Sequence, residues 1–216
     1  MAVGRVTAEQ FKTILTEISA AVSGEKDRLS ELDSVIGDGD HGFGMSNGFR
    51  VGTEAAAQKP DATIEEQLKT LGFALIREVG GASGTIFGSF FLGMAKAVKG
   101  RGDAGLSDFS DMFAEGLTLV QLRGKAEPGD KTMIDAIYPA LLSLRQSTAE
   151  GLSLIEGFKI AATAAWDGAE KTKLMIGKHG RAKYFREKSV GFQDAGATTM
   201  AIVIGSIART LESLAS

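Results

Sequence analysis

The sequence contains no cysteine and, among its 216 residues, only three prolines and two histidines. Without cysteine the chain can form neither disulfides nor thiolate metal sites, and it has no cysteine nucleophile. This fits a reducing compartment. The two histidines, His41 and His179, are too few and too scattered to suggest a histidine metal site. Scarce proline and 44% hydrophobic residues indicate a globular protein and not a disordered one.

Long apolar runs and an excess of positive charge are also missing. The most apolar stretches, residues 87–98 and 200–208, are interrupted by glycine or lysine and are shorter than the roughly 20 residues that cross a bilayer. Residues 1–5 do not lead into the apolar core of a signal peptide. The net charge of -3 offers no basic footprint for nucleic acid. We therefore expect a cytoplasmic protein with neither a membrane span nor a nucleic-acid partner.

Helical periodicity, in contrast, extends over most of the chain. Thr7 with Gln10, and Thr63 with Glu66, form capping boxes that open two amphipathic helices, the second ending near Gly80. The β-branched run 202–204 is compatible with a buried strand, but its alanine- and leucine-rich flanks favour a helix. We predict one all-α domain over residues 1–216, an antiparallel bundle. The pattern predicts further helices at residues 25–36, 43–57, 84–98, 107–123, 132–148, 152–175 and 197–214.

Thirteen of the 28 glycines lie in four joints between these helices, which also contain charged and hydroxyl residues. The joints are residues 37–44, 80–84, 124–132 and 177–196. In an up-and-down bundle, alternate loops lie at the same end. Joints that are far apart in sequence are therefore expected to converge on one ligand.

Three carboxylates, Asp33, Asp38 and Asp40, surround the first joint. Hard oxygen ligands suit Mg²⁺, which usually takes one or two carboxylates per ion and leaves its other positions to water and phosphate. Taken alone, the same residues also describe an aspartate- and glycine-rich turn with solvated charges. A calcium-binding EF-hand is excluded, because the position that needs a bidentate glutamate, counted from Asp38, is Phe49.

The other joints combine glycine with cations or with the start of a helix. Residues 80–84 lead into a helix whose backbone N–H groups suit phosphate oxygens, although the glycines fit a cap or close packing equally well. Residues 124–132 miss the P-loop pattern, because Asp130 is inserted and a helix precedes the joint. In the fourth joint, Arg181 and Lys183 either neutralise phosphate or form a solvated basic loop, and Asp194 suits a helix N-cap.

Together, and in this order, the four joints resemble the nucleotide-binding (L) subunit or domain of dihydroxyacetone kinases, the DhaL/DAK2 domain family. The similarity runs from about Leu32 to the final helix. The resemblance implies a barrel of eight antiparallel helices with the nucleotide at one end. The matching segments are Asp33 with Gly37 to Gly42, Gly80 to Gly84, Gly124 to Met133, Gly180 to Ala182, and Gln193 to Thr198.

The resemblance also implies roles for individual residues. Asp33, Asp38 and Asp40 match the carboxylates that hold two Mg²⁺ ions, and none of the three is required to act as a nucleophile. Gly44 stands where the family usually has an asparagine, and Ala195 replaces a proline, so the phosphate contacts and the rigidity of the last loop are in question there. Contacts to ADP or ATP are expected from His41, Gly42, Phe43, Gly44, Ala82, Ser83, Gly124, Met133, Arg181, Asp194, Ala195 and Gly196.

In this family a histidine of a separate K subunit or domain holds the keto-sugar. The resemblance therefore implies a subunit of a glycerone-type kinase that phosphorylates dihydroxyacetone or a relative. The donor is either ATP from solution or a phosphohistidine on a phosphotransferase-type subunit that recharges bound ADP. Two alternatives stay open: an L-type domain of a kinase for another substrate, such as a fatty acid, and a regulatory module that docks in its metal-nucleotide form.

Overall fold

A computed structural model describes residues 4–216, and within them the chain is almost entirely helical. Three short 3-10 turns, η1 (Thr172–Leu174), η2 (Ala182–Tyr184) and η3 (Arg186–Ser189), lie between the last two helices. The α-helices are α1 (Ala8–Gly24), α2 (Lys26–Ile36), α3 (His41–Ala57), α4 (Ile64–Glu78), α5 (Gly81–Ala97), α6 (Leu106–Gly124), α7 (Ile134–Ala149), α8 (Leu154–Lys171) and α9 (Ala195–Ser213).

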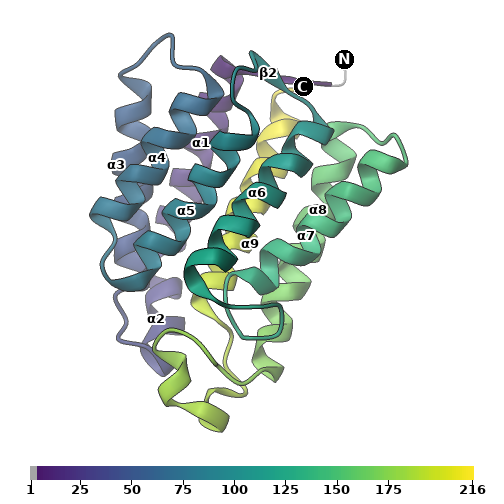
Figure 1. The fold of residues 1–216 in the computed structure, drawn as a ribbon. Helices are drawn as coiled ribbons and strands as arrows, with labels where there is room; N and C mark the ends of the chain where they lie inside the picture. The colour runs from purple at the N-terminus through teal and green to yellow at the C-terminus, as the bar shows by residue number, and fades with distance from the viewer. Residues whose placement is uncertain (1–3) are drawn as a thin grey trace.

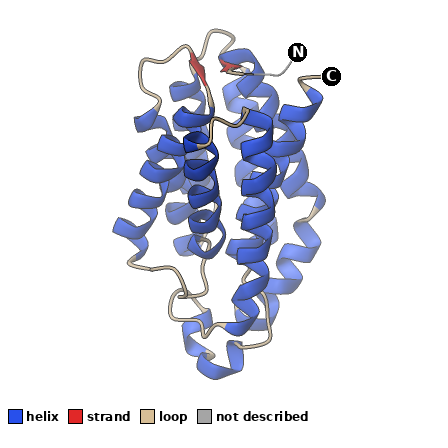
Figure 2. Cartoon of the chain, turned by 90° about the vertical axis from the view of Figure 1, so that its right-hand side faces the viewer, coloured by secondary structure: helices blue, strands red, loops and turns tan. Residues whose placement is uncertain are grey.

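Eight of the helices form a closed barrel (Figures 1 and 2). Helix α1 packs against α3, each helix from α3 onward packs against its successor, and α9 returns to α1. Helix α2 continues α1 after a break at Glu25 and packs against α3. The predicted antiparallel eight-helix barrel is confirmed. Between residues 4 and 216, no helix is both long and apolar enough to cross a membrane.

Phenylalanine rings fill the middle of the barrel. Phe90 packs edge-to-face on Phe91 and on Phe113, with ring centroids 5.5 Å and 5.4 Å apart. Phe109 and Phe158 meet in the same way at 5.0 Å. Such pairs contribute about 0.5–1.5 kcal/mol each beyond the burial of their surface. These contacts tie α5, α6 and α8 into one rigid scaffold for the loops at its ends.

Helix α9 is buried on nearly all sides, because it contacts α1, α2, α7 and α8. Ile202, Val203 and Ile204 are 4% exposed or less. A helix that is apolar all round lies in the interior, and this explains the β-branched run. The helical interpretation of residues 202–204 is confirmed.

Some predicted boundaries need correction. Helix α5 begins at Gly81 and not at residue 84, so Ala82 and Ser83 belong to its first turn. The helix expected over 152–175 ends at Lys171 and continues as the turn η1. Strands were not predicted, yet β1 (Val6–Thr7) and β2 (Asp103–Ala104) pair in antiparallel register. Two residues are too few to show an alternating pattern.

Candidate functional site

The four joints lie together at one end of the barrel, the lower end in Figure 1. Neighbouring helices run antiparallel, so the α2–α3, α4–α5, α6–α7 and α8–α9 connections fall on the same side. The short β1–β2 pair lies at the opposite end. The four joints therefore lie at one end of the barrel, as expected for alternate loops of an antiparallel bundle.

Three carboxylates cluster at the first joint. One ligand oxygen from each of Asp33, Asp38 and Asp40 lies within 4.8 Å of the others. Asp33 Oδ2 accepts from the N–H groups of Gly39, at 2.9 Å, and of His41, at 3.4 Å. A Cβ on Gly37 would lie 2.1 Å from Asp33 Oδ1, so only glycine lets that carboxylate fold over the end of α2.

The carboxylates of the cluster repel one another. Burial, and then the neighbouring carboxylates of Asp38 and Asp33, raise the pKa of Asp40, while Arg181 lowers it. Asp38 Oδ2 forms an ion pair with Arg181 Nη2 at 2.5 Å, which joins the first joint to the fourth. A divalent cation would relieve this repulsion, and three carboxylates form the hard oxygen set that Mg²⁺ prefers. The donor set therefore fits the predicted metal.

His41, the first residue of α3, is 7% exposed, and its Nε2 lies 2.9 Å from Thr199 Oγ1. Burial lowers the pKa of His41 to about 4, so the ring is neutral at pH 7. Its ring also packs against Phe87, with centroids 5.8 Å apart. Thr199 was not among the predicted site residues. The only sequence signal for this contact is that Thr199 lies in the first turns of α9, five residues after the N-cap Asp194.

The start of α5 presents uncapped backbone to the joint. Its N-cap is Gly80, which offers no side-chain hydrogen bond, and Gly81 has a φ of 67°. Nothing lies within 4 Å of a Cβ built on either glycine. The first N–H groups of a helix lack intrahelical partners, and an open N-terminus attracts anions. Ala82 and Ser83 lie in this first turn, as a phosphate-facing loop requires.

Gly44 and Gly48 lie close to Val79 at the end of α4. A Cβ at Gly44 would meet Val79 Cγ1 at 3.3 Å, and one at Gly48 would meet Val79 Cγ2 at 2.6 Å. These glycines bring α3 against the end of α4, immediately before the second joint. Phe43, by contrast, is 57% exposed, and Lys26 Nζ lies 4.7 Å from its ring centroid.

The remaining predicted residues lie around the start of α9 and the third joint. Asp194 caps α9, because its Oδ1 accepts from Ala197 N–H at 2.7 Å, as predicted. Burial raises the pKa of Asp194 to about 7. Ala195 is the first residue of α9, a position where proline and alanine both fit, so this departure leaves the helix start intact. A Cβ on Gly196 would approach Met133 N at 3.6 Å.

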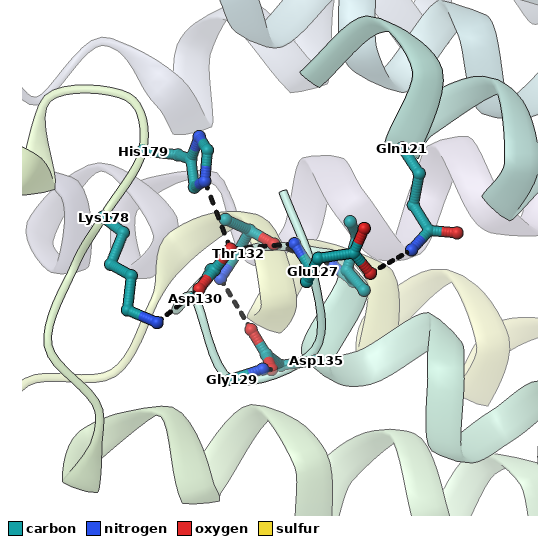
Figure 3. A network of polar contacts seen from close by, with 9 residues as sticks. Gln121, Glu127, Gly129, Asp130, Thr132, Asp135, Lys178 and His179 are labelled. Atoms are coloured by element: carbon teal, nitrogen blue, oxygen red, sulfur yellow. Dashed lines mark hydrogen bonds and ion pairs between the residues drawn. The ribbon is translucent and has the colours of Figure 1, made fainter. Parts of the chain in front are cut away.

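Gly124 ends α6, where a Cβ would meet Ile86 Cδ1 at 3.3 Å. In the same joint, Asp135 accepts from the N–H groups of Gly129 and Thr132 (Figure 3). Lys131 is buried and donates to backbone carbonyls, unlike the lysine of a P-loop. In the sequence, Asp130 and Lys131 belong to a failed P-loop pattern and to the matching segment Gly124 to Met133, but their contacts and those of Asp135 were not predicted. Lys183 makes no ion pair to the carboxylates and lies over the Tyr184 ring, with Nζ 4.9 Å from its centroid.

A helical barrel with clustered carboxylates, an uncapped helix N-terminus and a basic loop at one end is equipped to bind a phosphate ester through a divalent cation. The family model described as the DAK2 domain matches residues 35–209. The chain therefore belongs to the DAK2 domain family.

Two relatives match this chain over most of their own length. The PEP-dependent dihydroxyacetone kinase, ADP-binding subunit DhaL, of Escherichia coli (strain K12) is 41% identical over 92% of this chain and 95% of the relative. A second ADP-binding subunit DhaL, of the PEP-dependent dihydroxyacetone kinase 2 of Listeria innocua, is 37% identical over 94% of both chains.

A solved structure has the same fold. The dihydroxyacetone kinase of C. freundii, in complex with AMP-PNP and Mg²⁺, superposes with a TM-score of 0.70 at 26% identity. The superposition covers 92% of this chain and 33% of the other, so this chain spans about a third of the C. freundii kinase.

Proposed function

We propose that this chain is the nucleotide-binding subunit of a dihydroxyacetone-type kinase. In this proposal Asp33, Asp38 and Asp40 hold two Mg²⁺ ions that bind the phosphates of ADP or ATP. The observation that carries it is the cluster of three carboxylate oxygens within 4.8 Å of one another, at the end of the barrel where α5 starts without a side-chain cap. The names of the E. coli and Listeria relatives as ADP-binding subunits support it.

Bound Mg²⁺ supplies charge neutralisation for the phosphates and for the phosphoryl group in transfer. The residues of the chain have mainly a positioning task. The first turn of α5, with Ala82 and Ser83, offers N–H donors to phosphate oxygens. Arg181 brings a guanidinium to the same place, since it already reaches Asp38. No side chain of this site is assigned as a nucleophile or as a general base.

The nucleotide contacts predicted from the sequence remain part of the proposal. At the start of α3 these are His41, Gly42, Phe43 and Gly44. His41 is neutral and held by Thr199, so it suits a hydrogen bond to nucleotide and not an ion pair. Beside the third and fourth joints the predicted contacts are Gly124, Met133, Asp194, Ala195 and Gly196.

The substrate, partner and donor are also proposed. A substrate-binding K subunit holds dihydroxyacetone or a related keto-sugar, and this chain alone is inactive. The PEP-dependent names of the relatives favour a phosphohistidine subunit over free ATP as the donor that recharges bound ADP. We treat residues 1–216 as a single L-type domain that works in the cytosol.

A reconstitution assay tests this function. Phosphorylation of dihydroxyacetone is measured with the chain alone, and then with a K-type partner plus either ATP or a phosphohistidine donor. We expect negligible turnover by the chain alone and rapid turnover with the partner. Asp38→Asn should abolish the turnover that the partner supports, whereas Asp111→Asn, the same change on the exposed surface of α6, should leave it unchanged. Rapid phosphorylation without a partner would contradict the role as a subunit.

A further inference from the structure

The loop between α8 and α9, residues 172–194, is held at its base by one buried ammonium group. Lys131 is 1% exposed, and its Nζ donates to the carbonyl oxygens of Thr172, at 2.6 Å, and of Phe192. These residues lie at the beginning and near the end of the loop, so one side chain joins its two ends. A buried ammonium group is tolerated only where such acceptors satisfy it.

A second set of contacts joins the middle of the same loop to Asp130. Asp130 Oδ1 accepts from Lys178 Nζ at 2.7 Å, and Asp130 Oδ2 lies 3.2 Å from His179 Nε2. The carbonyl oxygen of Asp130 also accepts from Lys178 N–H at 3.2 Å. Figure 3 shows Lys178 and His179 reaching Asp130 from the loop. The contacts stop two residues before Arg181, which pairs with Asp38 at the carboxylate cluster.

The segment that makes both contacts is itself fixed. Asp135 accepts from the N–H groups of Gly129, at 2.5 Å, and Thr132, at 2.8 Å, and Asp130 Oδ2 accepts from Glu127 N–H at 2.8 Å. Lys131 has a φ of 62°, in the left-handed region that side chains with a Cβ rarely adopt. Such a conformation persists where the surroundings over-determine it, and it is often found where function requires it.

The two side chains make their polar contacts with the loop, including Thr172, which is both the first residue of the loop and the C-cap of α8. Within residues 4–216, the polar partners of Asp130 and Lys131 lie in the loop or in their own segment. The helices themselves pack through a separate apolar core.

We propose that Asp130 and Lys131 are positioning residues that seat the loop 172–194, so that Arg181 stays over the carboxylate cluster and bound nucleotide is released slowly. This inference rests on the proposed function, because it needs nucleotide at that end of the barrel. It adds a determinant of nucleotide retention that lies outside the predicted contact residues.

The test is the release rate of a fluorescent ADP analogue, preloaded with Mg²⁺ and chased with excess unlabelled ADP in a stopped-flow instrument. Lys131→Met and Asp130→Asn should each raise the release rate about 10-fold, and the association rate should change less. Lys188→Met, at an exposed lysine of the same loop, should release at the wild-type rate. Leu154→Ala, in the buried core at the other end of α8, should lower the melting temperature without changing release.

A double-mutant cycle separates positioning from a general loss of order. If the contacts of Asp130 and Lys131 with the loop act through Arg181, Asp130→Asn should have little further effect on the ADP release rate in an Arg181→Ala background. Full additivity, or release at the wild-type rate in Asp130→Asn, would overturn the inference even if Lys131→Met does not fold. Absence of Mg²⁺-dependent ADP binding by the wild type would instead overturn the proposed function, so the two failures are distinguishable.

Discussion

The two ends of the barrel differ in how many of their helix N-termini are capped by side chains. At the end away from the site, Thr7, Thr63 and Ser153 cap α1, α4 and α8, each in a box with a glutamine or glutamate three residues later. Helix α6 also starts there, and Asp108 accepts from Gly105 N–H. At the site end, α3 and α5 begin without a side-chain cap. Asp194 caps α9 at the site end, so the backbone donors that are left for a ligand there are those at the starts of α3 and α5.

Charge follows the same division. The end away from the site balances its carboxylates locally, as in the pair between Arg5 and Asp108 at 2.7 Å. At the site end, Asp33, Asp38 and Asp40 face one another, and Arg181 forms an ion pair with Asp38. Crowded carboxylates that repel one another beside open N–H groups contribute little to folding. This arrangement becomes favourable when a cation and an anion bind together, as a metal nucleotide does.

The largest expected effect is the loss of a carboxylate. Asp40→Asn should weaken Mg²⁺-dependent ADP binding by more than about 100-fold, because even outer-shell partners of a metal contribute roughly 10- to 100-fold. The melting temperature should not fall, since removing one of three repelling charges relieves strain in the free protein. Calorimetric titration with ADP measures the first quantity and thermal unfolding the second. Wild-type affinity in Asp40→Asn would contradict the metal assignment.

Arg181→Ala should have the next largest effect. Loss of a charge-assisted contact to phosphate should lower ADP affinity about 10-fold or more, with little change in melting temperature, because the side chain is 61% exposed. Lys188→Ala in the same loop provides the matched control. If Arg181→Ala unfolds readily but binds ADP normally, the arginine has a structural role.

Gly81 and Gly80 provide a comparison within the site end. An added Cβ meets nothing at either position, but Gly81 has a φ of 67° and Gly80 a φ of -66°. Gly81→Ala should therefore cost about 1–2 kcal/mol of unfolding free energy and reduce ADP affinity. Gly80→Ala should be nearly neutral for stability. Equal stability losses in urea denaturation would show that the backbone at Gly81 is not the determinant.

The smallest effect is expected at the opposite end. Thr63→Ala removes the cap of α4 and should cost about 1 kcal/mol of stability while leaving ADP affinity unchanged. Thr118→Ala, the same change in the middle of α6, removes only a bond to the carbonyl four residues earlier and should cost less. An ADP affinity that falls in Thr63→Ala would mean that the two ends are coupled.

Local signals in the sequence predicted much of this architecture. The boxes at Thr7 and Thr63 and the cap at Asp194 form as expected, because each depends on residues three positions apart. The carboxylates of Asp33, Asp38 and Asp40 cluster because a single tight joint brings them together. Contacts between residues that are close in sequence could therefore be predicted, and the helix of residues 202–204 followed from the composition of its flanks.

Contacts between residues that are far apart in sequence could not be predicted in this way. His41 and Thr199 are 158 positions apart, and the pair forms only because α9 closes the barrel against α1. Lys131 was recognised as part of an imperfect P-loop pattern, yet its partners are carbonyls 41 and 61 positions away. Backbone carbonyls carry no sequence signature, so a lysine that binds them looks like any other lysine.

The most direct test of the account is a crystal structure with ADP and Mn²⁺ in place of Mg²⁺, with the metal located by its anomalous scattering. We predict two peaks within coordination distance of Asp33, Asp38 and Asp40, with the phosphates directed at the first turn of α5. Metal bound elsewhere, or ADP bound with no metal among these three carboxylates, would contradict it.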